Sequence, residues 1–236
     1  MEAIVLAGGL GTRLRTAVPD LPKPMAPVAG RPFFAWILDR LADAGFRRAV
    51  LAVGYRHEVI RDQFGSHYRG VELVYSVEDA PLGTGGAMRL ALGHVSGSPV
   101  FVLNGDTYLD VDYVAMSAAH AAHGVALSVA VVRVPDVSRY GSLEIEDDRI
   151  CGFLEKGSHG PGYINAGVYL VDTEVLTGIP AGAPYSFEQE LMVPGVVRLR
   201  PLAFRTDGLF IDIGVPEDYE RAQGLFGARR ERYPRP

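Results

Sequence analysis

Short apolar runs alternate with segments of helical periodicity through residues 1–130. The apolar runs predict strands at residues 3–7, 49–53, 71–76, 100–103 and 126–132. Between them, apolar residues recur at three- and four-residue spacing and predict helices at residues 32–44, 57–64, 85–93 and 111–123. Strands that are apolar on both faces are typical of a parallel sheet with helices on either side. The pattern therefore predicts an α/β fold, with a mostly parallel central sheet and helices on both faces.

The pattern changes in the second half of the chain. Shorter strand-like runs, separated by Gly, Asp and Pro, predict a small antiparallel region at residues 142–145, 150–154 and 164–170. Ser186 followed three residues later by Gln189 predicts the capping box of a helix. Residues 216–226 predict the last helix, with Pro216 in its first turn.

We expect one Rossmann-like domain over residues 1–227, made of a half at about 1–130 and a half at about 131–227. The remaining residues, 228–236, are basic and contain proline, so we expect a loose tail. Composition does not fix the oligomeric state, and a homodimer stays open.

Composition narrows the class of protein. Hydrophobic residues make up 48% of the 236 residues, charged residues make up 22%, and the net charge is −5. An acidic balance argues against nucleic-acid and anionic-membrane partners. The one cysteine, Cys151, excludes an internal disulfide and a cysteine zinc site, and we expect a reduced thiol on a strand. No signal peptide or membrane-spanning run is evident, so a cytoplasmic protein is expected.

A glycine-rich loop follows the first apolar run and reads Leu-Ala-Gly-Gly-Leu-Gly-Thr-Arg-Leu at residues 6–14. Its glycines allow close approach of the backbone to a ligand, and consecutive amides can form an anion-binding nest. Leu14 stands where a Gly-x-Gly-x-x-Gly motif needs its third glycine, and the Gly-Lys-Ser/Thr of a Walker loop is absent. A tight strand-to-helix turn is the alternative, but Arg13 favours phosphate binding.

A lysine held between prolines follows, in Pro22-Lys23-Pro24-Met25. The two prolines should hold Lys23 in a rigid extended segment. An ordinary surface loop is the alternative, and the nearby glycine loop favours a functional lysine.

Two carboxylates occur where a metal site is plausible on chemical grounds. Asp106 follows an apolar strand and should project at the carboxyl edge of the sheet, where open α/β folds bind ligands. Asp212 interrupts an apolar run and needs a partner or a metal if it is buried. Mg²⁺ takes one or two carboxylates together with phosphate oxygens and water. A turn residue and a helix cap are the alternatives for Asp106 and Asp212.

Taken together, these motifs resemble the sugar-1-phosphate nucleotidyltransferases. The resemblance runs in order from residue 3 to about residue 220 and includes the segments at 6–14, 22–25, 83–87, 104–106, 155–156, 165–169 and 212–214. It implies transfer of a nucleoside monophosphate from a nucleoside triphosphate to a sugar 1-phosphate, with release of pyrophosphate and with Mg²⁺ as cofactor. The half at about 1–130 would bind the nucleotide, and the half at about 131–227 the sugar.

The resemblance also implies roles for individual residues. Arg13 and Lys23 would be catalytic, and Mg²⁺ would bind Asp106 and Asp212. The nucleotide would contact Leu6, Ala7, Gly8, Gly9, Gly11, Thr12, Arg13, Glu78, Gly83, Thr84 and Asp106. The sugar phosphate would contact Gly105, Glu155, Lys156, Asn165 and Gly167.

Glu78 bears on the nucleobase. An ionised carboxylate accepts hydrogen bonds and donates none, which suits the N–H donors on the pairing edge of guanine better than uracil or thymine. The fuller pattern around 19–27, 81–87 and 211–219 resembles the guanylyltransferases that act on D-glycero-D-manno-heptose 1-phosphate. The resemblance thus implies GTP and a heptose 1-phosphate as substrates.

Several alternatives remain open at this point. A thymidylyl-, uridylyl- or cytidylyltransferase acting on a hexose or amino-sugar 1-phosphate would share the fold. A glycosyltransferase would use an Asp-x-Asp metal site, and Asp110 and Asp112 have that spacing. A non-catalytic nucleotide-sugar sensor is a further alternative, although it would not need to retain Arg13 and Lys23.

Overall fold

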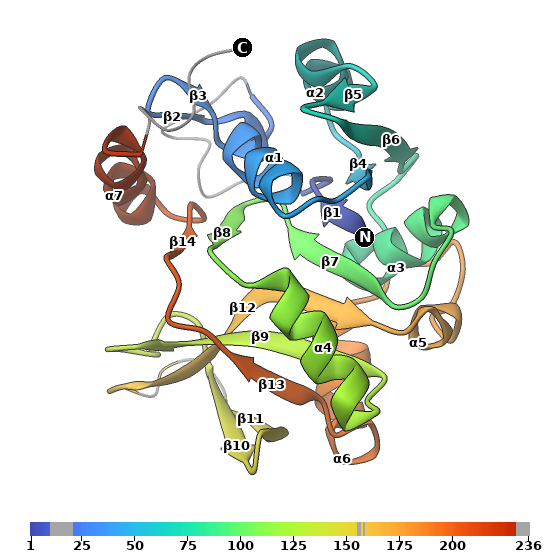
Figure 1. Ribbon diagram of the computed structural model, residues 1–236, viewed down its shortest axis with the longest axis vertical. Coiled ribbons are helices and arrows are strands. Elements are labelled where there is room, and N and C mark those ends of the chain that lie inside the picture. The colour runs from blue at the N-terminus through green and yellow to red at the C-terminus, as the bar shows by residue number, and fades with distance from the viewer. Residues whose placement is uncertain (10–20, 155–156, 158, 230–236) are drawn as a thin grey trace.

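A ten-stranded mixed sheet forms the centre of the computed structural model, which describes residues 1–9, 21–154, 157 and 159–229 (Figure 1). In spatial order its strands are β10 (Ser142–Glu146), β11 (Arg149–Leu154), β13 (Leu202–Arg205), β9 (Leu127–Val134), β12 (Gly162–Val171), β7 (Val100–Asn104), β1 (Glu2–Leu6), β4 (Arg48–Val53), β6 (Val71–Val77) and β5 (His67–Tyr68). Two short antiparallel pairs lie beside it, β2 (Pro27–Val28) with β3 (Arg31–Pro32), and β8 (Thr107–Leu109) with β14 (Phe210–Asp212).

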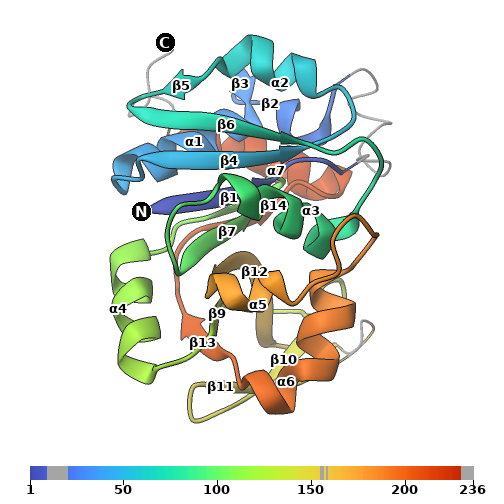
Figure 2. The same ribbon diagram turned by 90° about the vertical axis from the view of Figure 1, so that its right-hand side faces the viewer.

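Helices cover both faces of this sheet, as Figures 1 and 2 show. The α-helices are α1 (Phe33–Asp43), α2 (His57–Phe64), α3 (Gly83–Ala91), α4 (Tyr113–His123), α5 (Thr173–Thr177), α6 (Val193–Leu199) and α7 (Pro216–Gly227). The 3₁₀ helices are η1 (Lys23–Met25) and η2 (Leu92–His94), and η3 (Phe187–Met192) is a π-helix. No helix in the described ranges combines the length and apolar character needed to cross a bilayer.

The alternation of side chains along each strand creates two separate apolar cores. In β1, Ala3 and Val5 join the core beneath α1 and α7, whereas Ile4 joins the core beneath α3 and α5. Trp36 of α1 and Phe226 of α7 are fully buried and pack with ring centroids 4.8 Å apart. Because β1 is apolar on both faces, it can lie only in the middle of a covered sheet, as the sequence predicts.

The predicted α/β architecture is confirmed. The central pairings β7–β1, β1–β4 and β4–β6 are parallel, and each predicted strand and helix of residues 1–130 is present. Helix α3 begins at Gly83 rather than Gly85, because the carbonyl of Tyr185 accepts the N–H groups of Gly85 and Gly86 and fixes the first turn.

The second half has the predicted antiparallel character. Strand β12 pairs antiparallel with both β7 and β9, and β10 and β11 form an antiparallel pair, with Cys151 exposed on β11. The capping-box prediction is partly wrong. Ser186 Oγ accepts the Gln189 N–H, but the reciprocal acceptor for the Ser186 N–H is the Glu190 carboxylate, and the helix that follows is a π-helix. The wider π turn brings Glu190 rather than Gln189 back over the N-terminus.

One edge of the sheet gathers the ends of several parallel strands. Strands β1, β6 and β7 belong to the parallel part of the sheet, so their carboxyl ends lie at the same edge. Strand β12 lies next to β7 and carries the second half directly against the first. The small β8–β14 pair places Asp212 opposite Thr107, one residue after Asp106. The division into two functional halves over residues 1–227 stays a prediction.

Candidate active site

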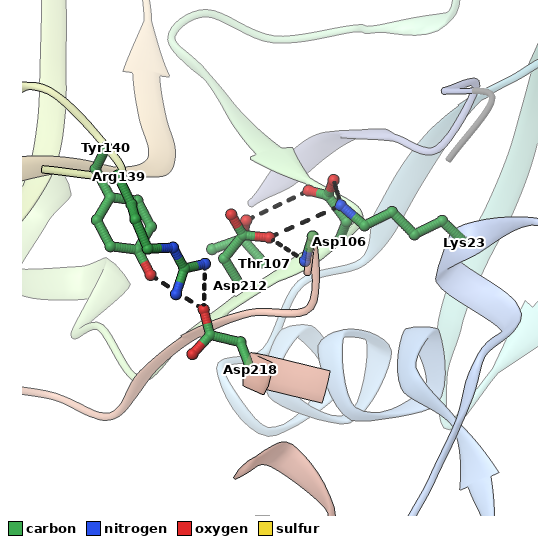
Figure 3. A network of polar contacts seen from close by, with 8 residues as sticks. Lys23, Asp106, Thr107, Arg139, Tyr140, Asp212 and Asp218 are labelled. Carbon is green, nitrogen blue, oxygen red and sulfur yellow. Dashed lines mark hydrogen bonds and ion pairs between the residues drawn. The ribbon is translucent and has the colours of Figure 1, made fainter. Parts of the chain in front are cut away.

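A lysine and two aspartates meet at the carboxyl end of β7 (Figure 3). Lys23 Nζ lies 2.5 Å from Asp106 Oδ2 and 3.8 Å from Asp212 Oδ1. Lys23 belongs to η1, which Pro22 and Pro24 hold in place, and its side chain is only 14% exposed. Prolines on both sides restrict the backbone of η1, and the ion pairs with Asp106 and Asp212 direct the ammonium.

Asp212 reaches this cluster through hydrogen bonds of the segment after β14. The Gly214 N–H donates to Asp212 Oδ1 at 2.7 Å, and the Ile213 N–H donates to the Asp106 carbonyl at 3.1 Å. Burial raises the pKa of the Asp212 carboxyl, and the charge of Asp106 raises it further, while Lys23 and the Gly214 amide oppose both. Two carboxylates that share one ammonium keep excess negative charge, which favours an additional cation.

The donor set fits Mg²⁺ chemically. Asp106 and Asp212 supply two hard oxygen ligand groups close to one ammonium. Proteins that bind Mg²⁺ commonly supply no more than this, because substrate phosphates and water complete the octahedron. Within the described ranges, no cluster of three or more His, Cys, Asp or Glu side chains forms an all-protein metal cage. The arrangement therefore suits a metal that arrives with a phosphate ligand.

A cavity of about 290 Å³ opens beside Asp106 and is the candidate nucleotide site. Its lining includes the predicted residues Leu6, Gly8, Gly9, Glu78, Gly83, Thr84 and Asp106. Ala7 is buried at the end of β1, where its N–H donates to the Ala52 carbonyl at 2.7 Å. The predicted Gly11, Thr12 and Arg13 lie outside the described residues.

Glu78 projects into this cavity from the end of β6. Its Oε2 accepts the Leu82 N–H at 2.8 Å, which ties it to the turn before α3. A Cβ on Gly8 would lie 2.7 Å from Glu78 Oε1, so any larger residue at position 8 would displace that oxygen. Burial raises the pKa of the Glu78 carboxyl, and the Leu82 amide opposes the rise. The carboxylate is therefore positioned in the lining, with oxygen lone pairs left for a ligand.

A second cavity of about 540 Å³ is the candidate sugar site. Asn165 and Tyr169 of β12, Tyr140, Gly141 and Asn104 contribute to its lining. Asn104 also lines the nucleotide cavity, so the two cavities meet near Asp106. The predicted Glu155 and Lys156 lie outside the described residues.

Two predicted glycines hold the backbone where the cavities meet. The Gly105 N–H donates to the Leu6 carbonyl at 2.8 Å, and a Cβ on Gly105 would lie 2.6 Å from that oxygen. Gly167 has φ +71°, and a Cβ there would lie 2.7 Å from Asn104 Nδ2. Both positions require glycine for the close approach of β1, β7 and β12, and a contact of either glycine with the sugar phosphate stays a prediction.

The sequence did not reveal a second polar cluster beside the candidate metal site. Asp218 of α7 is 5% exposed and accepts from Arg139 Nη2 at 2.7 Å and from the Tyr140 hydroxyl at 3.3 Å (Figure 3). The Tyr140 ring packs edge-on against Phe210 of β14 at 5.8 Å. No local pattern marks these residues, because they meet only when α7 docks beside the segment before β10.

The Asp-x-Asp spacing at 110–112 has structural explanations. Asp110 Oδ1 pairs with Arg40 Nη2 at 3.0 Å, and Asp112 Oδ1 caps α4 by accepting the Ala115 N–H at 2.9 Å. Both carboxylates therefore already have partners away from Asp106.

The sequence and fold place this chain in a known class. Residues 2–225 match the nucleotidyl transferase family, and the chain belongs to that family. Among characterised relatives, it is 40% identical to D-glycero-alpha-D-manno-heptose 1-phosphate guanylyltransferase of Aneurinibacillus thermoaerophilus, with 94% of this chain and 97% of the relative covered. The protein of the same name from Campylobacter jejuni is 39% identical, with 93% and 97% covered.

Solved structures agree with this placement. HddC from Yersinia pseudotuberculosis superposes with a TM-score of 0.86 at 36% identity, covering 95% of this chain and 99% of that one. The same protein has been crystallised in complex with GMP-PN, and that structure superposes with a TM-score of 0.85. The predicted family and fold are thereby confirmed.

Proposed function

We propose that this protein transfers GMP from GTP to D-glycero-α-D-manno-heptose 1-phosphate and releases pyrophosphate. The observation that carries the proposal is the position of Lys23, Asp106 and Asp212 beside the nucleotide and sugar cavities. The names of the relatives that cover nearly the whole chain supply the nucleotide and the sugar.

The proposed reaction is an in-line displacement at the α-phosphorus. An oxygen of the sugar phosphate forms a bond to that phosphorus, and the bond to the bridging oxygen of pyrophosphate breaks. The attacking phosphate is already ionised, so no general base is required. Lys23 stabilises charge on the α-phosphate, and Arg13 and Lys156 keep their predicted roles on the pyrophosphate and the sugar phosphate. Mg²⁺, held by Asp106 and Asp212, would neutralise charge and act as a Lewis acid.

The proposed base specificity depends on Glu78. Its carboxylate lines the nucleotide cavity and accepts hydrogen bonds without donating any. The ring N–H and amino group of guanine are adjacent donors, so they match a carboxylate, whereas uracil and thymine offer one donor between two carbonyls. A thymidylyl-, uridylyl- or cytidylyltransferase is therefore the less favoured alternative. The other predicted residues of the glycine loop and of α3 would contact the nucleotide, and the glycines among them would do so through their backbone amides.

The cellular compartment, the cofactor and the oligomeric state are part of the same proposal. We propose a cytoplasmic enzyme that depends on Mg²⁺, because GTP is a cytoplasmic metabolite and the two carboxylates suit that ion. The homodimer stays a prediction.

The test is pyrophosphate release with Mg²⁺ across GTP, ATP, UTP, CTP and dTTP, each with several sugar 1-phosphates. These include heptose, mannose and glucose 1-phosphates. We expect release confined to GTP, and highest with the heptose 1-phosphate. Turnover with another pair would keep the transfer chemistry and overturn the substrates. Nucleotide binding without turnover of any pair would favour a sensor.

A further inference from the structure

Glu188 lies in the sugar cavity at the beginning of the π-helix η3. The Ser186 Oγ accepts the Gln189 N–H at 3.1 Å and fixes the first turn of η3. Phe187 directly precedes Glu188 and is fully buried. Its N–H donates to Thr84 Oγ1 at 2.9 Å. The backbone that carries Glu188 is therefore anchored on both sides. π-Helical turns are rare and occur frequently at functional sites.

Asn165 is one of the residues that the sequence assigned to the sugar, but its amide is already engaged within the protein. Its Nδ2 donates to the Tyr169 hydroxyl oxygen at 2.8 Å and to Glu188 Oε2 at 3.5 Å, and these two contacts use both of its N–H groups. Its Oδ1 accepts the Gly167 N–H at 3.0 Å. Asn165 thus orients Glu188 and has no N–H left for a ligand.

The Glu188 carboxylate keeps capacity for a ligand. Among the described residues it forms no ion pair, and its Oε1 meets only the side-chain amide of the neighbouring Gln189 at 3.4 Å. The same cavity offers apolar walls at Leu143, Phe153 and Val193. A sugar has the matching chemistry, because its hydroxyl groups donate to a carboxylate and its C–H faces pack on apolar side chains.

We propose that Glu188 is a specificity-determining residue whose carboxylate accepts hydrogen bonds from hydroxyl groups of the sugar, with Asn165 as the residue that positions it. This rests on the proposed function, since it concerns the second substrate of the same site. The ribose of the nucleotide is the rival ligand, because Glu188 also lines a smaller cavity that includes Leu6 and Thr84.

The test compares wild type with Glu188→Gln, Glu188→Asp and the control Glu220→Gln, whose side chain is exposed on α7. Losing hydrogen bonds to a charged acceptor should raise the KM for the sugar 1-phosphate about 10- to 100-fold in Glu188→Gln, with the KM for GTP within about twofold. Glu188→Asp keeps the charge and should recover part of the loss. A rise in the KM for GTP alone would overturn the proposal in favour of the ribose.

Deoxy analogues of the sugar 1-phosphate separate binding from a merely structural role. Wild type should discriminate about tenfold or more against the analogue that lacks the contacted hydroxyl, and Glu188→Gln should lose that discrimination. Unchanged discrimination in the variant overturns the inference while the proposed transfer stands. No turnover by wild type with any nucleotide and sugar pair overturns the proposed function, and this inference with it.

Discussion

Lys23 Nζ lies 2.5 Å from Asp106 Oδ2, although the two residues are 83 positions apart in the sequence. The same ammonium is 3.8 Å from Asp212, so one lysine partly neutralises both proposed metal ligands (Figure 3). A bound nucleotide would introduce an α-phosphate at the same place. The ammonium is thereby held ready by the carboxylates before any substrate is bound, which is the preorganisation that electrostatic catalysis requires.

Removing this ammonium should reduce turnover strongly. We expect Lys23→Ala to lower kcat by about 10²- to 10³-fold, as for the loss of one preorganised electrostatic donor. Steady-state pyrophosphate release measures the effect, and circular dichroism verifies that the fold is intact. Arg198→Ala, on the exposed side of α6, serves as a charge-matched control. Near-normal turnover of a folded Lys23→Ala protein would contradict the assigned role.

The metal proposal predicts a changed dependence on Mg²⁺. Asp212→Asn keeps the shape of the side chain but removes one charged ligand, so half-maximal activity should need about tenfold more Mg²⁺. Titration of Mg²⁺ after removal of metal with EDTA gives the measurement, and wild type should lose activity in EDTA and regain it on Mg²⁺ addition. If the titration curves of wild type and Asp212→Asn coincide, Asp212 is not a ligand.

The close approach of Gly8 to Glu78 predicts that a side chain at position 8 weakens the binding of the nucleotide and not that of the sugar 1-phosphate. In Gly8→Ala the new Cβ would lie 2.7 Å from Glu78 Oε1 and would displace that flexible carboxylate. We expect the KM for GTP to rise about tenfold and the KM for the sugar 1-phosphate to stay unchanged. Gly93→Ala is the matched control, because a Cβ there meets nothing within 4 Å. Equal KM values for GTP in the two variants would show that GTP binding does not depend on the present position of the Glu78 carboxylate.

The raised pKa of Glu78 predicts how stability changes with pH. A carboxyl whose pKa is higher in the folded than in the unfolded protein favours folding at low pH, below its ordinary value of 4.5, and this contribution is lost as pH rises through the raised value. Glu78→Gln lacks this titration. Relative to wild type, its free energy of unfolding in urea should therefore increase between pH 4 and pH 7. A constant difference across that range would mean that burial does not raise this pKa.

Sequence reasoning was sufficient wherever the determining interactions are local. The apolar run at residues 3–7 and the helical spacing at 57–64 were enough to predict β1 and α2, because burial on both faces and helical periodicity are visible within one segment. Asp106 and Asp212 each stood out within their own segments, the resemblance made them candidate metal ligands, and the pairing of β8 with β14 brings them together. A local pattern can therefore identify a strand, a helix or a candidate residue within its own segment.

The residues that were missed owe their roles to distant contacts. Glu188 acquires meaning only when η3 packs beside β12, and no periodicity predicts a π turn. Asn165 lines the candidate sugar cavity, and only the fold shows that Tyr169 and Glu188 occupy its N–H groups. Contacts of this kind join segments that are far apart in the sequence. No local pattern in a single sequence encodes how such segments pack.

Replacing Asp218 should lower the stability of the protein and should leave nucleotide binding unchanged. This buried carboxylate accepts hydrogen bonds from Arg139 and Tyr140 and forms an ion pair with Arg221 at 3.3 Å, and so joins α7 to the wall of the sugar cavity. Asp218→Ala should lower the free energy of unfolding by about 1–3 kcal/mol, less than for a fully buried ion pair because both arginines are about half exposed.

The same change should act on the sugar side of the reaction. Tyr140 lines the sugar cavity, so loss of its partner should raise the KM for the sugar 1-phosphate several-fold and leave the KM for GTP unchanged. Urea unfolding and steady-state kinetics of Asp218→Ala, compared with Glu220→Ala on the same helix, measure both effects. Wild-type stability in Asp218→Ala would show that the cluster does not hold α7 in place, and a rise confined to the KM for GTP would show that it supports the other substrate.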